Sequence, residues 1–176
     1  PFSADSFAGL LCSDSFHYFQ RTIGCVREME RVVAPDGVTA ITRIANATVE
    51  PHEGYELTPD GYRSLFKKRQ VTLIDEDTLL ERYLRKLGPN LDGNLSEESL
   101  IGNKWLSAVV SSRSDVFRDH GSFEIWPHAS GRLRINPLYR EETVNDRGDR
   151  VMGFHFPSQW YEFEDGGYRQ YAPDVV

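Results

Sequence analysis

The stretch from Pro1 to Asn46 has the clearest pattern of hydrophobic and polar positions in the chain. Two apolar runs of strand length, Phe7–Ser13 and Gly37–Ile44, flank the segment Thr22–Val33, in which apolar residues recur every three or four positions. That spacing predicts an amphipathic helix. The Pro-Asp-Gly sequence at residues 35–37 predicts its end and a sharp reversal into the second strand. The apolar face of this helix consists of Ile23, Val26, Met29, Val32 and Val33.

A strand, a helix and a second strand in this order predict a parallel βαβ unit. Such a unit carries its chemistry at the carboxyl ends of its strands. The polar and aromatic loop Ser13–Phe19 follows the first strand, and the loop-like segment Asn46–Tyr55 follows the second. We therefore expect a functional site at these two loops.

A helix is predicted to begin at Thr58, which offers a capping hydroxyl and is followed by Pro59 at the first helical position. This helix is expected to run to about Lys68. The basic run Lys67–Arg69 at its end is most simply a solvated helix terminus, favoured by the helix dipole. A phosphate site is the alternative interpretation.

The next segments also predict helices. One spans Asp75–Leu87 with its leucines and Tyr83 inside, and another opens at Ser96 with Trp105, Ala108 and Val109 on its buried face. The run Val71–Ile74 fits either a short strand or an extended entry to the helix after it. The segments together predict a helical insertion packed over a sheet edge.

The C-terminal part predicts a β-hairpin, because two β-rich runs, residues 133–144 and 150–156, flank the turn sequence Asn145–Asp149. An aromatic segment that includes Trp160 follows it. Together with the phenylalanines of the second strand, this segment either lines a lipophilic substrate pocket or forms a small hydrophobic core.

Composition narrows the functional classes. The chain has 176 residues, 39% of them hydrophobic and 27% charged, as in a soluble globular protein of one domain or slightly more. Its net charge of −7 argues against unaided binding of nucleic acid, which requires clustered basic residues. No apolar run has the length of a membrane span. Cys12 and Cys25 are interpreted as buried thiols in a reducing cytoplasm. The scattered histidines match no common metal-binding spacing, so no metal site is predicted.

Two motifs surround the predicted helix. Pro1, Phe2 and Asp5 lead into the first strand and its polar loop, and residues 27–37 have the sequence Arg-Glu-Met-Glu-Arg-Val-Val-Ala-Pro-Asp-Gly. This arrangement resembles the fourth strand, the following helix and the fifth strand of class I S-adenosylmethionine-dependent methyltransferases, whose pattern ends in Arg-Val-Leu-Lys-Pro-Gly-Gly. Ala34 replaces the usual Lys of that pattern. The resemblance covers about a quarter of the chain.

The resemblance implies an α/β fold in which residues 1–46 form part of a Rossmann-like methyltransferase sheet. Residues 47–176 would then be a helical insertion and a C-terminal antiparallel β-hairpin, forming a substrate or lid region. The sheet in this family ends in an antiparallel pair, and we expect the hairpin to take that place. The family's glycine-rich cofactor loop is missing, since no Gly-x-Gly-x-x-Gly occurs. Because the chain starts at Pro1 and its first strand needs neighbours, we expect an upstream segment of the same protein to supply that half, unless it has been lost.

The resemblance also places the methyl-bearing end of S-adenosyl-L-methionine at the loop after the first strand. His17 is the candidate catalytic base, because a histidine of near-neutral pKa can accept a proton during methyl transfer. The alternative is that His17 packs or forms hydrogen bonds at the strand end. Asp14 would meet the cofactor's ammonium group or cap the next turn, and the aromatic rings would hold the sulfonium or pack in the core. The candidate cofactor-binding residues are Cys12, Ser13, Asp14, Ser15, Phe16 and Tyr18.

Substrate contacts are predicted from three further places. His52 and Tyr55 lie in the loop after the second strand. His128 and Arg132 suit an acidic substrate group, although a loop with structural salt bridges explains them as well. Trp160 is the candidate substrate contact in the aromatic segment.

These observations predict transfer of a methyl group from S-adenosyl-L-methionine to a small-molecule substrate by a cytoplasmic methyltransferase. This chain would form the methyl-proximal and substrate-side part of that enzyme. The alternative is a non-catalytic α/β binding or interaction domain that is derived from a methyltransferase but does not bind the cofactor. Neither interpretation includes nucleic acid or a membrane among the partners.

Overall fold

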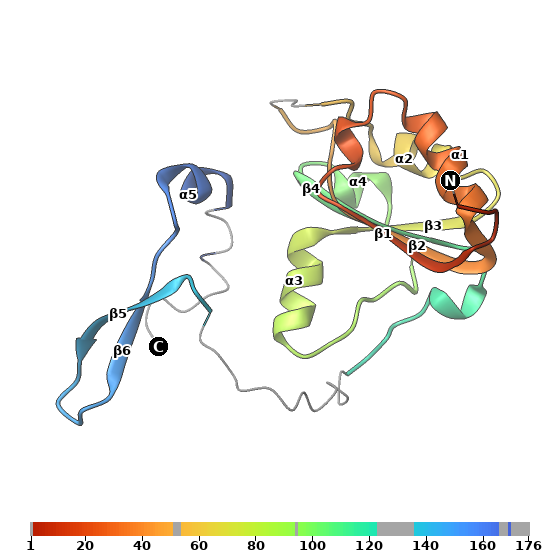
Figure 1. The fold of residues 1–176 in the computed structure, drawn as a ribbon. Coiled ribbons are helices and arrows are strands. Elements are labelled where there is room, and N and C mark those ends of the chain that lie inside the picture. The colour runs from red at the N-terminus through yellow and green to blue at the C-terminus, as the bar shows by residue number, and fades with distance from the viewer. Residues whose placement is uncertain (1, 51–53, 94, 123–135, 166–168, 170–176) are drawn as a thin grey trace. The chain divides into compact units, whose positions relative to one another are not determined.

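The computed structural model describes residues 2–50, 54–93, 95–122, 136–165 and 169. The chain divides into two compact units, residues 1–124 and 125–176. Among the described residues, the first contains a four-stranded mixed sheet with helices, and the second a two-stranded sheet and helix α5 (Figure 1). The predicted α/β class is confirmed. The boundary predicted at residue 46 stays a prediction, although strands on both sides of it share the first sheet.

The N-terminal βαβ unit forms as predicted. Strand β1 (Phe7–Ser13) leads through the short 3₁₀ helix η1 (Phe16–Tyr18) into helix α1 (Thr22–Val32) and then strand β2 (Val33–Ala45). β1 and β2 pair in parallel, from Gly9 opposite Val38 to Ser13 opposite Thr42. The two apolar runs therefore lie side by side with their carboxyl ends at one edge of the sheet.

The sharp reversal predicted at residues 35–37 is wrong. Val33, the C-cap of α1, is already extended, and β2 begins there. The Arg69 guanidinium holds this junction by donating to the carbonyls of Val33 at 3.0 Å and Ala34 at 3.1 Å. Gly37 is needed for close approach instead, because a Cβ there would lie 2.6 Å from Val33 Cγ1.

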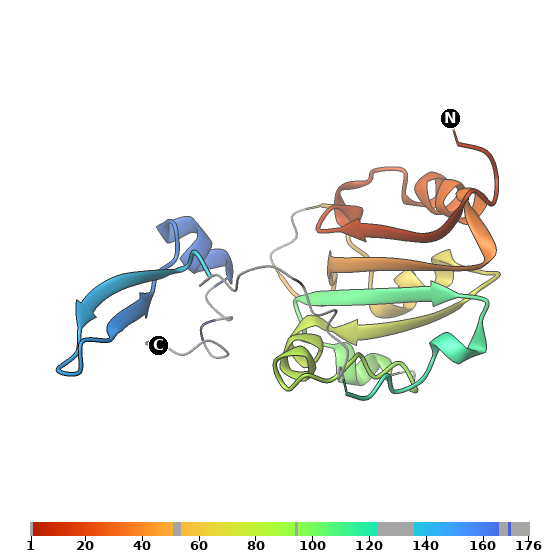
Figure 2. The same cartoon turned by 60° about the horizontal axis from the view of Figure 1, so that its bottom comes forward.

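The second half of the sheet differs most from the prediction. Strand β4 (Trp105–Ser111) pairs antiparallel with β2 and with strand β3 (Gln70–Asp75), giving the order β1-β2-β4-β3 (Figure 2). The helix predicted over residues 96–109 is wrong: helix α4 covers only Glu97–Leu100. A strand with neighbours on both sides and buried faces has few polar positions, so its sequence resembles that of a buried helix.

Two predicted helix starts are confirmed. Helix α2 (Pro59–Leu65) is capped by the Thr58 hydroxyl, which accepts from Gly61 N at 3.1 Å. Helix α3 (Glu76–Leu84) is capped by the Asp75 carboxylate, which accepts from Thr78 N at 2.7 Å. The predicted buried face of α3 is wrong, because none of its residues is buried. The 3₁₀ helix η2 (Ser114–Val116) follows β4.

The core of the first unit lies on one face of the sheet. Figure 1 shows α1, α2 and α4 on this face and α3 on the other. The helices contribute Val26, Met29 and Leu100 to the core, which meet the alternate residues of the strands. The strand residues of this core are Ile41, Ile44, Val71, Leu73, Leu106, Ala108 and Val110.

The second unit contains the predicted hairpin, of strands β5 (Tyr139–Val144) and β6 (Arg150–Phe154), followed by helix α5 (Gln159–Asp165). The side chain of Asn145 accepts from the backbone of Arg147 and Asp149 and fixes the turn. The expectation that this hairpin completes the main sheet is wrong, because β5 and β6 form their own sheet. The antiparallel pair that ends the main sheet is β4 with β3.

Candidate functional site

Polar side chains gather where the parallel strands β1 and β2 end, as the βαβ pattern predicts. Ser13 and Thr42 are register partners, and the Thr42 hydroxyl donates to Ser13 Oγ at 2.9 Å. Asp14 N then donates to the Thr42 carbonyl at 3.0 Å. These bonds tie the loop after β1 to the end of β2. We call Ser13, Asp14 and Thr42, together with the contacting residues described in the next paragraphs, the carboxyl-end site.

Asp14 and Arg43 both have left-handed backbones, with φ of 50° and 51°. Arg43 lies in an irregularity of the β2–β4 register, between Ile41 and Ile44. The bulge lets Arg43 Nε reach Asp14 Oδ1, at 3.3 Å. Non-glycine residues in this conformation carry strain, and strain and bulges concentrate at functional sites.

The Arg43 guanidinium also covers an aromatic ring. Its central carbon lies 4.7 Å from the centroid of Trp105, and Lys104 Nζ lies 5.0 Å from the same centroid. Glu76 Oε1 accepts from Arg43 N at 3.0 Å and from the Ser107 hydroxyl. The site therefore draws on β1, β2, the start of α3 and the start of β4.

The predicted base, His17, lies in η1 at 1% exposure. Its ring centroid is 4.1 Å from that of Tyr18 and 5.6 Å from that of Trp105, and its carbonyl accepts from Tyr55 N at 2.7 Å. The structure thus places His17 in the wall of the site, beneath Tyr18, which is 54% exposed. Its catalytic role stays a prediction.

The other predicted cofactor residues have mixed settings. Phe16 belongs to the core, at 1% exposure, while Ser13 and Asp14 are exposed. Ser15 Oγ lies 3.4 Å from Cys12 Sγ. Ser13, Asp14 and Tyr18 are the exposed members of this set, and the cofactor-binding role of the set stays a prediction.

The two cysteines were interpreted as buried thiols, and the structure makes them free thiols that are only half-buried. Cys12 and Cys25 are unbridged, half-buried and packed against the core. Burial raises the pKa of the Cys25 thiol, and the neighbouring Cys12 adds to this effect. The raised pKa of Cys25 is the opposite of the lowered pKa that activates a reactive cysteine.

Few predicted substrate residues join this site. Tyr55 does so through its bond to His17 and is half exposed. Trp160 belongs to the second unit, on α5, where it is exposed. His52, His128 and Arg132 lie outside the described residues. Within the described ranges, no group of three His, Cys, Asp or Glu side chains is arranged to hold a metal ion.

The sequence interpretation missed Thr42, Arg43, Glu76 and Trp105. Arg43 had a visible signal, because it is the charged residue within the apolar run Gly37–Ile44. Trp105 falls in a predicted helix, and Glu76 falls within the predicted helix Asp75–Leu87 without a role of its own. The helices in the described part of the chain lack the length and apolar composition of a membrane span.

No protein-family profile and no curated protein sequence matches the chain. Two solved structures show a low similarity to it. One is the YcgJ protein of Bacillus subtilis, with 17% identity and a TM-score of 0.36 over 65% of this chain and 68% of that chain. Another is the MccD protein, with 15% identity and a TM-score of 0.34 over 62% of this chain and 60% of that chain. Similarity at this level does not establish a family or a function.

Proposed function

We propose that this chain forms the methyl-proximal and substrate-side part of an S-adenosyl-L-methionine-dependent methyltransferase that acts on a small molecule. The observation that carries the proposal is the carboxyl-end site: a strained Asp14–Arg43 pair and a polar–aromatic loop stand where the parallel strands end. These are also the strands on which the resemblance to class I methyltransferases rests.

The sheet topology supports the same proposal. The family's sheet ends in an antiparallel pair, and here the parallel strands β1 and β2 are followed by the antiparallel pair β4 and β3. The pair of β4 and β3 lies nearer in sequence to the βαβ unit than the hairpin that was expected to supply it. The hairpin β5–β6 is therefore not needed to complete the main sheet.

The edge of the main sheet formed by β1 supports a role for an upstream segment. β1 lies at the end of the strand order among the described strands, and Leu11 in its centre is 70% exposed. An open edge with exposed apolar residues favours pairing with another strand. We propose that the glycine-rich half of the cofactor site pairs there, as part of the same protein.

The residues present fit one end of the cofactor. When bound, S-adenosyl-L-methionine supplies a methyl group activated by a sulfonium. The exposed carboxylate of Asp14 suits an ammonium group, and the half-exposed ring of Tyr18 suits a cation. His17 would accept a proton from the acceptor only if the acceptor reaches the imidazole past Tyr18, because the residue is buried.

A non-catalytic binding domain is the second candidate. The burial of His17 and the missing Gly-x-Gly-x-x-Gly sequence favour it. In this case the carboxyl-end site would bind a ligand without performing chemistry on it.

Calorimetric titration of S-adenosylhomocysteine into this chain and into the longest native form of the protein separates the two. Binding to the longer form alone supports a methyltransferase whose glycine-rich half lies upstream. Binding to this chain supports a complete site around Ser13–Tyr18. If neither form binds, the methyltransferase proposal fails and the binding domain replaces it.

The role of His17 has a separate test in the full-length protein. His17→Phe preserves a ring between Tyr18 and Trp105 but cannot accept a proton. We expect it to lower turnover while leaving cofactor affinity nearly unchanged. Turnover equal to that of the wild type would remove His17 from the mechanism.

A further inference from the structure

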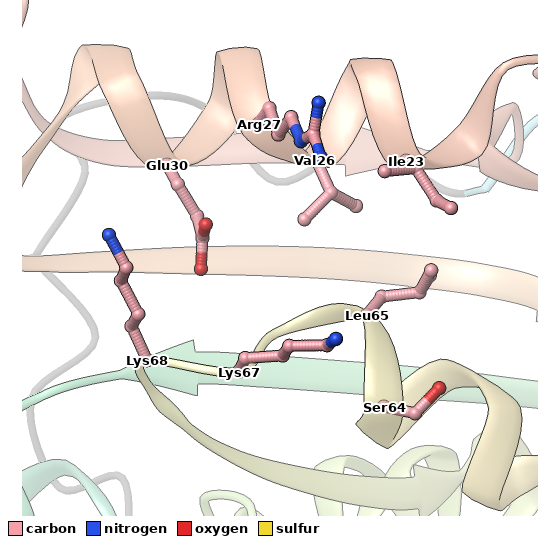
Figure 3. Close-up of a pocket in the computed structure, with 8 residues that line it drawn as sticks. All are labelled: Ile23, Val26, Arg27, Glu30, Ser64, Leu65, Lys67 and Lys68. Atoms are coloured by element: carbon pink, nitrogen blue, oxygen red, sulfur yellow. The ribbon is translucent and has the colours of Figure 1, made fainter.

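A cavity of about 550 Å³ lies between α1 and the C-terminal end of α2 (Figure 3). None of its lining residues belongs to the carboxyl-end site. Its size falls in the range of small-molecule sites. The function proposed above gives this cavity no role.

The cavity combines an apolar wall with three cations. Ile23, Val26 and Leu65 supply the apolar surface. Arg27, Lys67 and Lys68 supply the charges, and none of these three has an ion pair with a residue that the structure describes. Other arginines of the first unit do pair, for example Arg31 with Glu28 and Arg82 with Asp119. Three cations without an ion pair to a described residue therefore line this one cavity.

Glu30 adds a single carboxylate to the same wall. Its Oε1 is buried and accepts no hydrogen bond from the described residues. In Figure 3 the carboxylate extends from α1 toward the segment that carries Lys67 and Lys68. A buried acceptor without a donor is unfavourable, and a ligand that brings a donor removes this penalty.

We propose that the cavity binds a small α-amino acid with an apolar side chain. The carboxylate of the ligand meets Arg27, Lys67 and Lys68, its ammonium donates to Glu30, and its side chain covers Ile23, Val26 and Leu65. A simple anion satisfies the cations but faces Glu30 with a like charge. A simple amine satisfies Glu30 but faces three cations. A ligand with both groups matches the cations and the carboxylate together, and this inference does not depend on the methyltransferase proposal.

Three matched probes test the proposal by NMR titration of the ¹⁵N-labelled chain. Leucine carries both charges, 4-methylpentanoate is the same skeleton without the ammonium, and 3-methylbutylamine lacks the carboxylate. We expect leucine to shift the amide signals of α1 and residues 64–68, with a Kd about tenfold lower than that of either analogue, the difference that one charge-assisted hydrogen bond makes. Equal affinity for leucine and 4-methylpentanoate, or the absence of shifts with leucine, would overturn the proposal.

Variants test which side chain of the cavity contacts which charged group of the ligand. Glu30→Gln is expected to weaken leucine binding about tenfold and to leave 4-methylpentanoate binding unchanged or stronger, because a like charge is removed. Lys67→Gln with Lys68→Gln should weaken both ligands. Lys86→Gln, which changes an exposed lysine after α3, is the matched control and should change neither. Thermal unfolding of each variant by circular dichroism checks that the fold is intact. A Glu30→Gln variant that is folded and binds leucine as the wild type does would contradict the assignment of Glu30.

Discussion

Asn46 at the end of β2 offers the sharpest test of how the sheet holds the carboxyl-end site. The residue is 2% exposed, and its side-chain amide donates to the carbonyls of Leu100 and Asn103, each at 2.9 Å. Its Oδ1 accepts from Thr48 N at 3.1 Å. One side chain thus joins the end of β2 to the segment between α4 and β4.

Asn46→Ala removes all three bonds and supplies no replacement. The buried Leu100 carbonyl keeps only the longer bond from Asn103 N at 3.3 Å, and each of the three lost hydrogen bonds costs about 0.5–1.5 kcal/mol. We expect the free energy of unfolding to fall by about 2–4 kcal/mol. Urea denaturation followed by far-ultraviolet circular dichroism measures this loss, with the m-value unchanged.

Asn46→Asp and a surface control sharpen the test. A carboxylate at this position accepts from Thr48 N but faces two carbonyl oxygens, so burial and these oxygens would raise its folded-state pKa above the unfolded value. The destabilisation should therefore be full at neutral pH and decrease as the pH falls through the raised pKa, because the protonated form can donate. Asn103→Ala removes only an exposed bond to the Ser99 carbonyl and is the control. The reasoning is refuted if Asn46→Ala and Asn103→Ala have equal stability.

Two further predictions concern the same sheet. Burial raises the pKa of Tyr62 to about 12, so folding stability should fall as the pH rises from about 10 toward that value, by up to about 2–3 kcal/mol. Tyr62→Phe, which loses the bond to the Ala45 carbonyl, should lack this alkaline loss, and parallel stability curves for the two proteins would disprove it. Gly37→Ala should cost about 1–3 kcal/mol, because the new Cβ would lie 2.6 Å from Val33 Cγ1. Gly93→Ala, with no atom within 4 Å of its Cβ, should be nearly neutral in the same urea denaturation, and equal losses for both would contradict the packing argument.

The sequence predicted the parts of the fold whose signals are local. The period of Thr22–Val33 identifies α1 because the helix buries one face only, and its apolar positions Val26, Met29 and Val32 are the buried ones. Thr58 and Asp75 were recognisable as caps because capping depends on residues three positions apart. The position of the loop after β1, at the carboxyl end of the parallel strands, could be predicted from the βαβ connection alone.

The sequence did not predict β4, because its identity depends on distant neighbours. Trp105, Ala108 and Val109 fit the spacing of a helix face as well as they fit a strand buried on both sides. The pairing of Ala108 with Ile41 on one side and Leu73 on the other decides the matter, and neither partner is close in sequence. The misplaced hairpin follows from the same error, since without β4 the main sheet lacked an antiparallel pair.

Arg43 was not predicted as part of the site for a related reason. Its presence changes which ligands the site can bind. Asp14 was expected to meet an ammonium group, but the bulge in β2 brings Arg43 to 3.3 Å from its carboxylate. An incoming ammonium must then share Asp14 with an arginine whose guanidinium is also held over Trp105. Because that arginine is fixed on two sides, the ammonium gains less from Asp14 than it would from an unpaired carboxylate. A ligand with adjacent positive and negative groups avoids this competition, since its negative group can face Arg43 while its positive group faces Asp14.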